Sequence, residues 1–314
     1  MLKRTRRSSK RVQTSKNKQN KSTRKKDYNS KLESLGIIAD CINKYDTNFR
    51  KRKLPTLRAL EAILFMIETG LSYNKMEATK YLEYIDPSTL RKRFRKWVEL
   101  DIPRLVWNDI TSQYMEGQLL ANKRCFKTIF IDSTMIKNDL GMDCVGRNPT
   151  DRGRKGSKIS VAVSGDMALL GCSFAGSNQA DVTEVTNVID AIPSQLKSDG
   201  RHSINLVGDK GYVSKDLKTE LWNERKIRLV TENKKTKKNP IPEPLSRQDE
   251  ALLRQRYVVE NFFCSLKKSF RRFQIRRERW LRNFEGLFFI SATVMNMRII
   301  MGDTSDEMVE IEPK

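Results

Sequence analysis

Apolar residues recur at helical spacing in the first third of the chain. A helix is predicted to begin near Leu54 and to end before Gly70, with an apolar face formed by Leu57, Leu60, Ile63, Leu64 and Ile67. A short helix follows at Lys75 to Leu82. The next segment, "DPSTLRKRFRKWVE", predicts a capped helix from Pro87 to Glu99, whose buried stripe is formed by Leu90, Phe94, Trp97 and Val98. These helices predict a small all-α domain, helix-turn-helix-like, at residues 54–122.

Between Phe126 and Val230 the apolar pattern changes to that of strands. The strand-like segments are "FKTIFID", "KISVAVS", "ALLGCSF", "INLVGD" and "IRLVT". Helices are predicted near Thr183–Leu196 and Lys215–Arg225, and two more follow the Lys- and Pro-rich loop "NKKTKKNPIPEPLS", the last from Asn283 to Ile300. Short connections between the first strands, followed by strands and helices in alternation, predict a mixed α/β sheet flanked by helices. We assign this second domain to residues 123–302.

The composition adds a strong positive charge. Lys and Arg number 61 against 38 Asp and Glu, which gives a formal charge of +23. Residues 1–31 contain thirteen Lys or Arg and one acid, so we expect a disordered basic arm and linker at residues 1–53. The arm would either grip phosphates or serve as a localisation tag, and residues 303–314 form an acidic tail. Such an excess of positive charge favours nucleic acid as the partner, through counterion release.

Several classes of protein are disfavoured. No apolar run reaches the roughly 18–20 residues that a membrane span needs, and the first residues do not resemble a signal peptide. His202 is the only histidine, and the five cysteines form no CxxC pair, which disfavours a zinc site and a Ser-His-Asp triad. We expect no membrane partner and an intracellular protein that acts on DNA, in the cytoplasm or nucleoid of a prokaryote or in the nucleus of a eukaryote.

Three acids stand where an α/β fold places its chemistry. Asp132 closes the strand "TIFID", and Asp209 closes "INLVGD", although either side chain could also cap a turn. Glu260 lies halfway along "RQRYVVENFFCSLKKSFRR", on a helix with an apolar stripe of Val259, Phe263, Leu266, Phe270 and Phe273. It shares a face with basic residues, so a simple salt bridge with Arg256 is an alternative. Three hard oxygen ligands suit Mg²⁺ or Mn²⁺, and a pair of such ions promotes phosphoryl transfer.

These residues resemble a known family. The segments "FIDST" and "DKGY" and the pattern R-x3-E-x6-K, here Arg256, Glu260 and Lys267, are similar to the motifs of insertion-sequence DDE transposases. The resemblance extends from Leu54 to Ile300 and includes "NPTDRGRKGSKISVAV", which resembles the Arg/Gly-rich turn before the second strand. It implies an RNase H-like fold in which Asp132, Asp209 and Glu260 are catalytic and hold two Mg²⁺ or Mn²⁺ ions. It further implies cleavage and strand transfer at terminal inverted repeats, by a homodimer or larger assembly on paired ends.

Basic side chains complete the prediction. Arg91, Arg93 and Arg95 lie on the helix from Pro87 to Glu99, where they would read the major groove of double-stranded DNA or form a solvated face. The predicted contacts to DNA elsewhere are Arg152, Arg154, Lys155, Lys210, Arg256, Lys267 and Arg271. Two alternative functions remain: an RNase H-like nuclease without strand transfer, and a domesticated DNA-binding protein without activity.

Overall fold

Helices occupy the first part of the chain. The computed structural model describes residues 32–47, 53–76, 85–120, 127–149, 151–193, 204–233 and 244–302. Residues 32–45 are helical, and they are followed by α2 (Thr56–Thr69), α3 (Tyr73–Met76), α4 (Pro87–Glu99) and α5 (Ile102–Leu120). The basic arm at 1–31, the tail at 303–314 and His202 lie outside the described residues, so what we predicted for them stays a prediction.

The helix at residues 32–45 differs from the linker that we predicted there. Leu35, Ile38 and Ile42 are buried in the same apolar cluster as residues of α2 and α10. Their spacing is that of one helical face, but the basic composition of the preceding 31 residues dominated the prediction. The ordered chain therefore begins well before Leu54.

The helix α4 forms as its sequence predicts. The carboxylate of Asp86 accepts hydrogen bonds from the backbone N–H groups of Ser88 (3.2 Å) and Thr89 (2.8 Å), a cap typically worth about 1 kcal/mol. Pro87 occupies the first turn, where its missing N–H has no cost. The predicted stripe is confirmed, because Leu90, Phe94 and Trp97 are buried.

The sheet is mixed. Within the described residues its main strands are β1 (Thr128–Asn138), β3 (Lys155–Val163), β4 (Leu169–Gly176), β5 (Ile204–Val207) and β6 (Ile227–Val230), and two short strands, β2 (Gly146–Arg147) and β7 (Ile275–Arg276), extend it. Their order across the sheet is β4-β3-β1-β5-β6. β3 runs antiparallel to β1 and β4, whereas β5 and β6 run parallel to β1. The predicted mixed α/β sheet, flanked by helices and preceded by a helical region, is confirmed.

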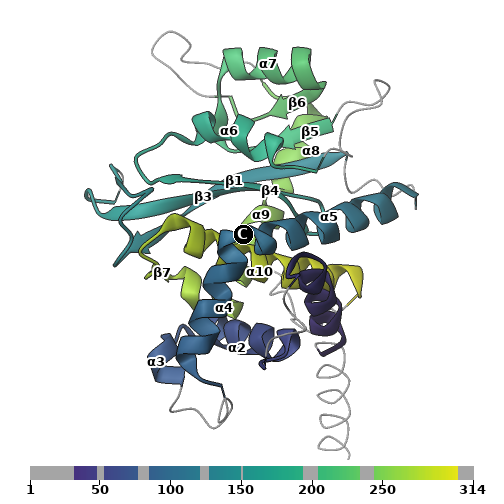
Figure 1. The fold of residues 1–314 in the computed structure, drawn as a ribbon. Helices are drawn as coiled ribbons and strands as arrows, with labels where there is room; N and C mark the ends of the chain where they lie inside the picture. Colours follow the sequence, from purple (N-terminus) through teal and green to yellow (C-terminus); the bar gives the residue numbers. More distant parts are fainter. Residues whose placement is uncertain are drawn as a thin grey trace, which may run out of the picture.

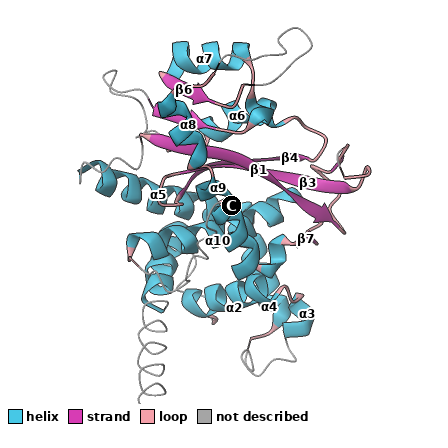
Figure 2. Cartoon of the chain, turned by 180° about the vertical axis from the view of Figure 1, so that it is seen from behind, coloured by secondary structure: helices cyan, strands magenta, loops and turns pink. Residues whose placement is uncertain are grey.

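Helices cover both faces of this sheet (Figures 1 and 2). The helices α6 (Asp181–Asp190) and α7 (Lys215–Arg225) lie on one face, and α9 (Tyr257–Ser269) and α10 (Leu281–Ile300) lie on the other, with α8 (Arg247–Arg254) near β6. Successive residues of β1 point to opposite faces: Ile129 and Ile131 join the cluster under α6 and α7, whereas Phe130 joins the cluster under α9 and α10. Asp132 follows Phe130 on the α9 face, and Ser133 follows Ile131 on the α6 face.

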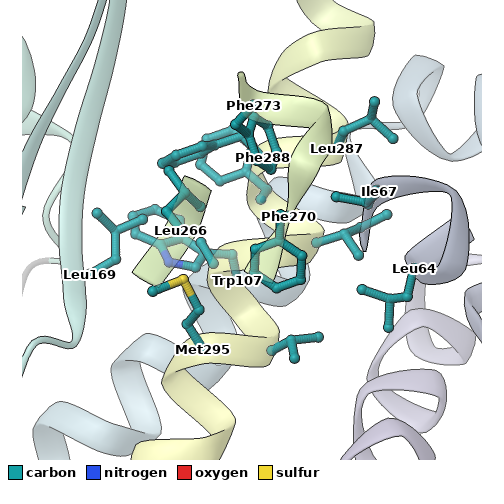
Figure 3. Close-up of a cluster of buried hydrophobic side chains, with 14 of the residues drawn as sticks. Leu64, Ile67, Trp107, Leu169, Leu266, Phe270, Phe273, Leu287, Phe288 and Met295 are labelled. Carbon is teal, nitrogen blue, oxygen red and sulfur yellow. The ribbon is translucent and has the colours of Figure 1, made fainter. Parts of the chain in front are cut away.

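The helical region and the sheet share one apolar core. Figure 3 shows Leu64 and Ile67 of α2 beside Phe270, which follows α9, and Leu287 of α10. Gly286 of α10 allows α4 to approach closely, because a Cβ atom at this position would lie 2.7 Å from Cγ2 of Val98. Within the described residues, no helix combines the length and the apolar character that crossing a membrane requires.

Candidate active site

Asp132 lies inside a long strand. We predicted that it would close its strand, but β1 continues to Asn138, and Asp132 pairs with Val161 of β3. Its Oδ1 accepts the backbone N–H of Ser133 at 2.8 Å. The prediction of a strand end was therefore wrong. The position is still an edge of the sheet, because the neighbouring strand β5 stops at Val207.

Asp209 lies beside Asp132 because β5 is parallel to β1. Phe130 of β1 pairs with Val207 of β5. Asp132 and Asp209 each follow this pair by two residues, so the two acids lie at the same level of the sheet. The carboxylate of Asp209 caps the 3-10 turn η5 (Lys210–Tyr212) by accepting the N–H of Gly211 at 2.7 Å. A Cβ atom on Gly211 would lie only 2.9 Å from Oδ1 of Asp209, so glycine leaves the room that this carboxylate needs.

Glu260 lies on α9, the helix that covers the face of the sheet on which Asp132 lies. It occupies the first turn of α9, which packs on β1 and β3, and its apolar stripe is buried as predicted. The guanidinium of Arg256, immediately before this helix, lies 3.5 Å from Oδ2 of Asp132 and 3.9 Å from Oε1 of Glu260. Arg256 therefore connects the first and third acids. In the described part of the chain, no three acid, histidine or cysteine side chains lie close enough to hold one ion between them.

The environment raises the pKa of Asp132. Burial is the largest cause, Asp209 and Asp181 add to it, and the N–H of Ser133 and the charge of Arg256 oppose it, so that the pKa is about 6. A buried carboxylate with two acidic neighbours and one cation has less positive charge around it than its ionised form needs. Nearby, Lys267 donates to Oγ1 of Thr134 at 2.6 Å, and burial lowers the pKa of this lysine.

Asp181 is an acid that we missed. It is the first residue of α6, where an acid is ordinarily read as favourable to the helix dipole. Its Oδ1 accepts hydrogen bonds from the hydroxyl of Ser133 (2.6 Å) and the ammonium of the buried Lys158 (2.7 Å). Its Oδ2 lies 3.3 Å from the position of a Cβ atom on Gly211, on the same side as Asp209. The signal in the sequence was an acid directly between a strand and a helix.

Two of the three predicted DNA-reading arginines are exposed, and the third is not. Arg91 and Arg95 lie on the solvent face of α4. Arg93 is 2% exposed, and its guanidinium donates to the carbonyl of Leu54 and to Oγ1 of Thr56 (2.7 Å) and lies 3.8 Å from Asp46. A residue held in this way does not face DNA, so the prediction for Arg93 was wrong.

The other predicted cations occupy different places. Arg152, Arg154 and Lys155 are exposed around the turn that leads into β3. Lys155 begins β3, six residues before Val161, the residue that pairs with Asp132. At 3.4 Å per residue, Lys155 therefore lies about 20 Å along the strand from Asp132. Lys210 is exposed and pairs with Glu232 at 3.0 Å, and Arg271 is exposed just after α9. Among the described residues, Arg256 is the one of these seven cations that pairs with Asp132 and Glu260, and Lys267 bonds Thr134, two residues after Asp132.

Comparisons with known proteins identify the family of this chain. The family model described as "Transposase DDE domain" matches residues 123–297. A putative transposase for insertion sequence element IS402 from Burkholderia cepacia is 31% identical over 166 residues, which cover 52% of this chain and 69% of that protein. Two solved structures align over most of the chain but with low scores. For the Mos1 transposase paired-end complex with left transposon end, the alignment covers 78% of each chain, with 10% identity and a TM-score of 0.23. For a pre-cleavage Mos1 transpososome, it covers 77% of this chain and 78% of that chain, with 11% identity and a TM-score of 0.25. Scores this low carry no argument about the site.

Proposed function

The chain belongs to the DDE transposase family and is a DNA transposase, and we propose that Asp132, Asp209 and Glu260 form its catalytic centre. The observation that carries this proposal is the position of Asp132 and Asp209 at one level of two parallel strands, where burial and acidic neighbours raise the pKa of Asp132 to about 6. Structural acids are normally neutralised by nearby cations, whereas this pair is left short of positive charge. A perturbed pKa with a specific cause is typical of a functional site.

The donor set fits a divalent cation such as Mg²⁺ or Mn²⁺. All three acids supply hard oxygen ligands, and Mg²⁺ commonly binds through one or two carboxylates while it keeps several waters. Asp132 and Asp209 would hold the ion, and Glu260 would join them by a change of rotamer, which its 61% exposed side chain allows. When bound, one or two such ions polarise the phosphate and activate the attacking oxygen.

The cations around the acids would bind and orient the DNA strand. Lys267 donates to Thr134, which lies two residues after Asp132 on the same face of β1. Its charge would neutralise a phosphate bound near the acids. Arg256 holds Asp132 and Glu260 together without DNA, and we propose that it turns to a phosphate when the acids take up a cation. The bound cation would then neutralise the acids, and Arg256 would neutralise the phosphate.

The DNA partner is the end of a mobile element and its target. Exposed Arg91 and Arg95 on α4 would read the terminal inverted repeat, and the basic arm would add contacts that do not depend on sequence. We propose that two or more copies act together on paired ends, inside the cell. Strand transfer, and not cleavage alone, is the expected outcome.

The test uses purified protein, Mg²⁺ or Mn²⁺, and a DNA fragment that carries the terminal inverted repeats of the element. Asp132→Asn, Asp209→Asn and Glu260→Gln should each lower cleavage about 100-fold or more while DNA binding is retained. The exposed Asp216→Asn in α7 serves as the matched control and should keep full activity. Joined products support transposition. Nicks without joined products would indicate a nuclease, and retention of DNA without cleavage would indicate a DNA-binding protein.

A further inference from the structure

The anchored acid Asp181 has one oxygen that its own contacts do not use. Oδ1 accepts hydrogen bonds from both Ser133 and Lys158, and Lys158 also donates to the carbonyl of Gln179 at 2.6 Å. The side chain is therefore fixed in orientation. Oδ2 is left on the side of Gly211, the same residue against which Asp209 rests.

The hydroxyl of Tyr212 is a second and independent sign of a ligand at this place. Tyr212 is 1% exposed, and its hydroxyl has no hydrogen-bond partner of normal geometry among the described residues. Burial first, and then the charges of Asp132, Asp181 and Asp209, raise the pKa of this hydroxyl, and Ser133 opposes the shift. The hydroxyl of Ser133 donates to Asp181 and forms no hydrogen bond of normal geometry with Tyr212. A buried polar group without a protein partner normally binds an ordered water.

We propose that Asp181 is a positioning residue of the metal centre, whose Oδ2 accepts a hydrogen bond from a water molecule that hydrates the cation held by Asp132 and Asp209. Tyr212 contacts the same water through its hydroxyl. This inference rests on the proposed function, and it adds an outer layer to the three acids of the family motif. Mg²⁺ keeps much of its hydration shell in proteins, so groups that orient its waters contribute to its affinity.

The geometry also explains the anchoring of Asp181 by a buried lysine. An acid that only favoured the start of α6 would be stabilised equally well in solvent, without burying an ammonium group. Lys158 instead neutralises the carboxylate, and Lys158 and Ser133 together hold Oδ1, which leaves Oδ2 on the side of Gly211 and Asp209. The side chain is thus held by residues of β1 and β3, the strands that carry Asp132 and its partner.

The test is a calorimetric titration of the full-length, DNA-free protein with Mn²⁺, which measures the affinity for the ion. Asp181→Asn keeps an oxygen that accepts from Ser133 and Lys158, so the fold should persist, and the Mn²⁺ affinity should fall about tenfold. Tyr212→Phe removes only a hydroxyl without a partner, so the metal-free protein should be at least as stable, while the Mn²⁺ affinity should fall several-fold. The matched control is Glu184→Gln, a buried acid on the same helix that bonds Ser173 at 2.9 Å away from the acids.

The outcomes separate the inference from the proposed function. Weaker Mn²⁺ binding by Asp181→Asn and Tyr212→Phe, with an unchanged affinity in Glu184→Gln, supports the role of Asp181. Wild-type affinity in both variants would overturn it, and so would an equal loss in the control, because that would indicate a general effect of destabilising α6. If Asp181→Asn does not fold, the result for Tyr212→Phe decides alone. Asp132→Asn should abolish binding in every case. If it does not, the proposed catalytic centre fails and not only this addition to it.

Discussion

Replacing Asp132 by asparagine should make the metal-free protein more stable. Ionised Asp132 is held in a place that raises its pKa from 3.8 to about 6, and at about 1.4 kcal/mol per pKa unit this costs the folded state roughly 3 kcal/mol at neutral pH. Because the side chain is 22% exposed, solvent screening lowers the expected value to about 2 kcal/mol. Asparagine has the same shape and no charge, so it should recover most of this free energy.

The stability that Asp132→Asn gains depends on pH. A carboxyl with a raised pKa in the folded state favours folding below its unfolded value, near pH 4, and this contribution is lost as the pH rises to about 6. The advantage of Asp132→Asn should therefore be complete at pH 8, about half as large at pH 5, and nearly absent at pH 4. Urea unfolding in EDTA at these pH values gives the difference directly, with the exposed Asp216→Asn as the control that should change little.

A divalent cation should reverse the order of stability. Mg²⁺ or Mn²⁺ binds only the folded wild-type protein and stabilises it by mass action, whereas the variant lacks one ligand and gains little. The reasoning would be refuted if Asp132→Asn were less stable than the wild type at pH 8 without metal, or if its gain were the same at pH 8 and pH 5. Either result would mean that Asp132 is neutralised in the folded protein and has no need of a cation.

Three further predictions concern the cations. Arg256→Gln removes the positive charge that competes with a metal ion, so Mn²⁺ should bind several-fold more tightly at pH 8 in the absence of DNA, and unchanged or weaker binding would contradict this competition. Arg93→Ala should lower the free energy of unfolding in urea by about 3–5 kcal/mol, because it removes the cation beside the buried carboxylate of Asp46, and a change below about 1 kcal/mol would contradict a stabilising ion pair. Arg95→Ala, two residues further along α4 and exposed to solvent, should leave stability intact but reduce the ratio of terminal-repeat to random-DNA binding by about tenfold, measured at one salt concentration. Equal losses on both DNAs would make it a phosphate contact.

Local patterns predicted the elements whose stability is local. The helix α7 spans Lys215–Arg225 as predicted, because its cap, Ser214, and its polar solvent face lie within the segment itself. The helix α5 was not predicted, although its apolar residues recur at helical spacing. Pro103 lies in its first turn, where proline is tolerated. Packing of α5 on α10 then stabilises the whole segment.

Contacts between distant residues determined what the sequence did not predict. Arg93 was assigned to the solvent face because arginine is rarely buried, and only the distant Asp46 and Thr56 make its burial favourable. Asp132 was placed at a strand end because polar residues follow it. Pairing with β3 and β7 extends β1 through those residues to Asn138. The three acids were identified from their motifs, but the place of Asp181 depends on the pairing of β1 with β3, which brings Ser133 and Lys158 to one side.

The helical region and the acids are coupled by packing rather than by a linker. Gly286 lets α4 contact α10 closely, and α10 shares the apolar cluster of α9, the helix that carries Glu260. DNA held by Arg91 and Arg95, as we propose, would thus lie at a fixed position relative to the three proposed catalytic acids, because interiors packed at this density transmit displacement instead of absorbing it. A flexible hinge between the two would allow the cut to vary in position along the DNA. Under the proposed function, the shared core would fix the distance between the bound repeat and the cleaved phosphate, as cutting at the end of an element requires.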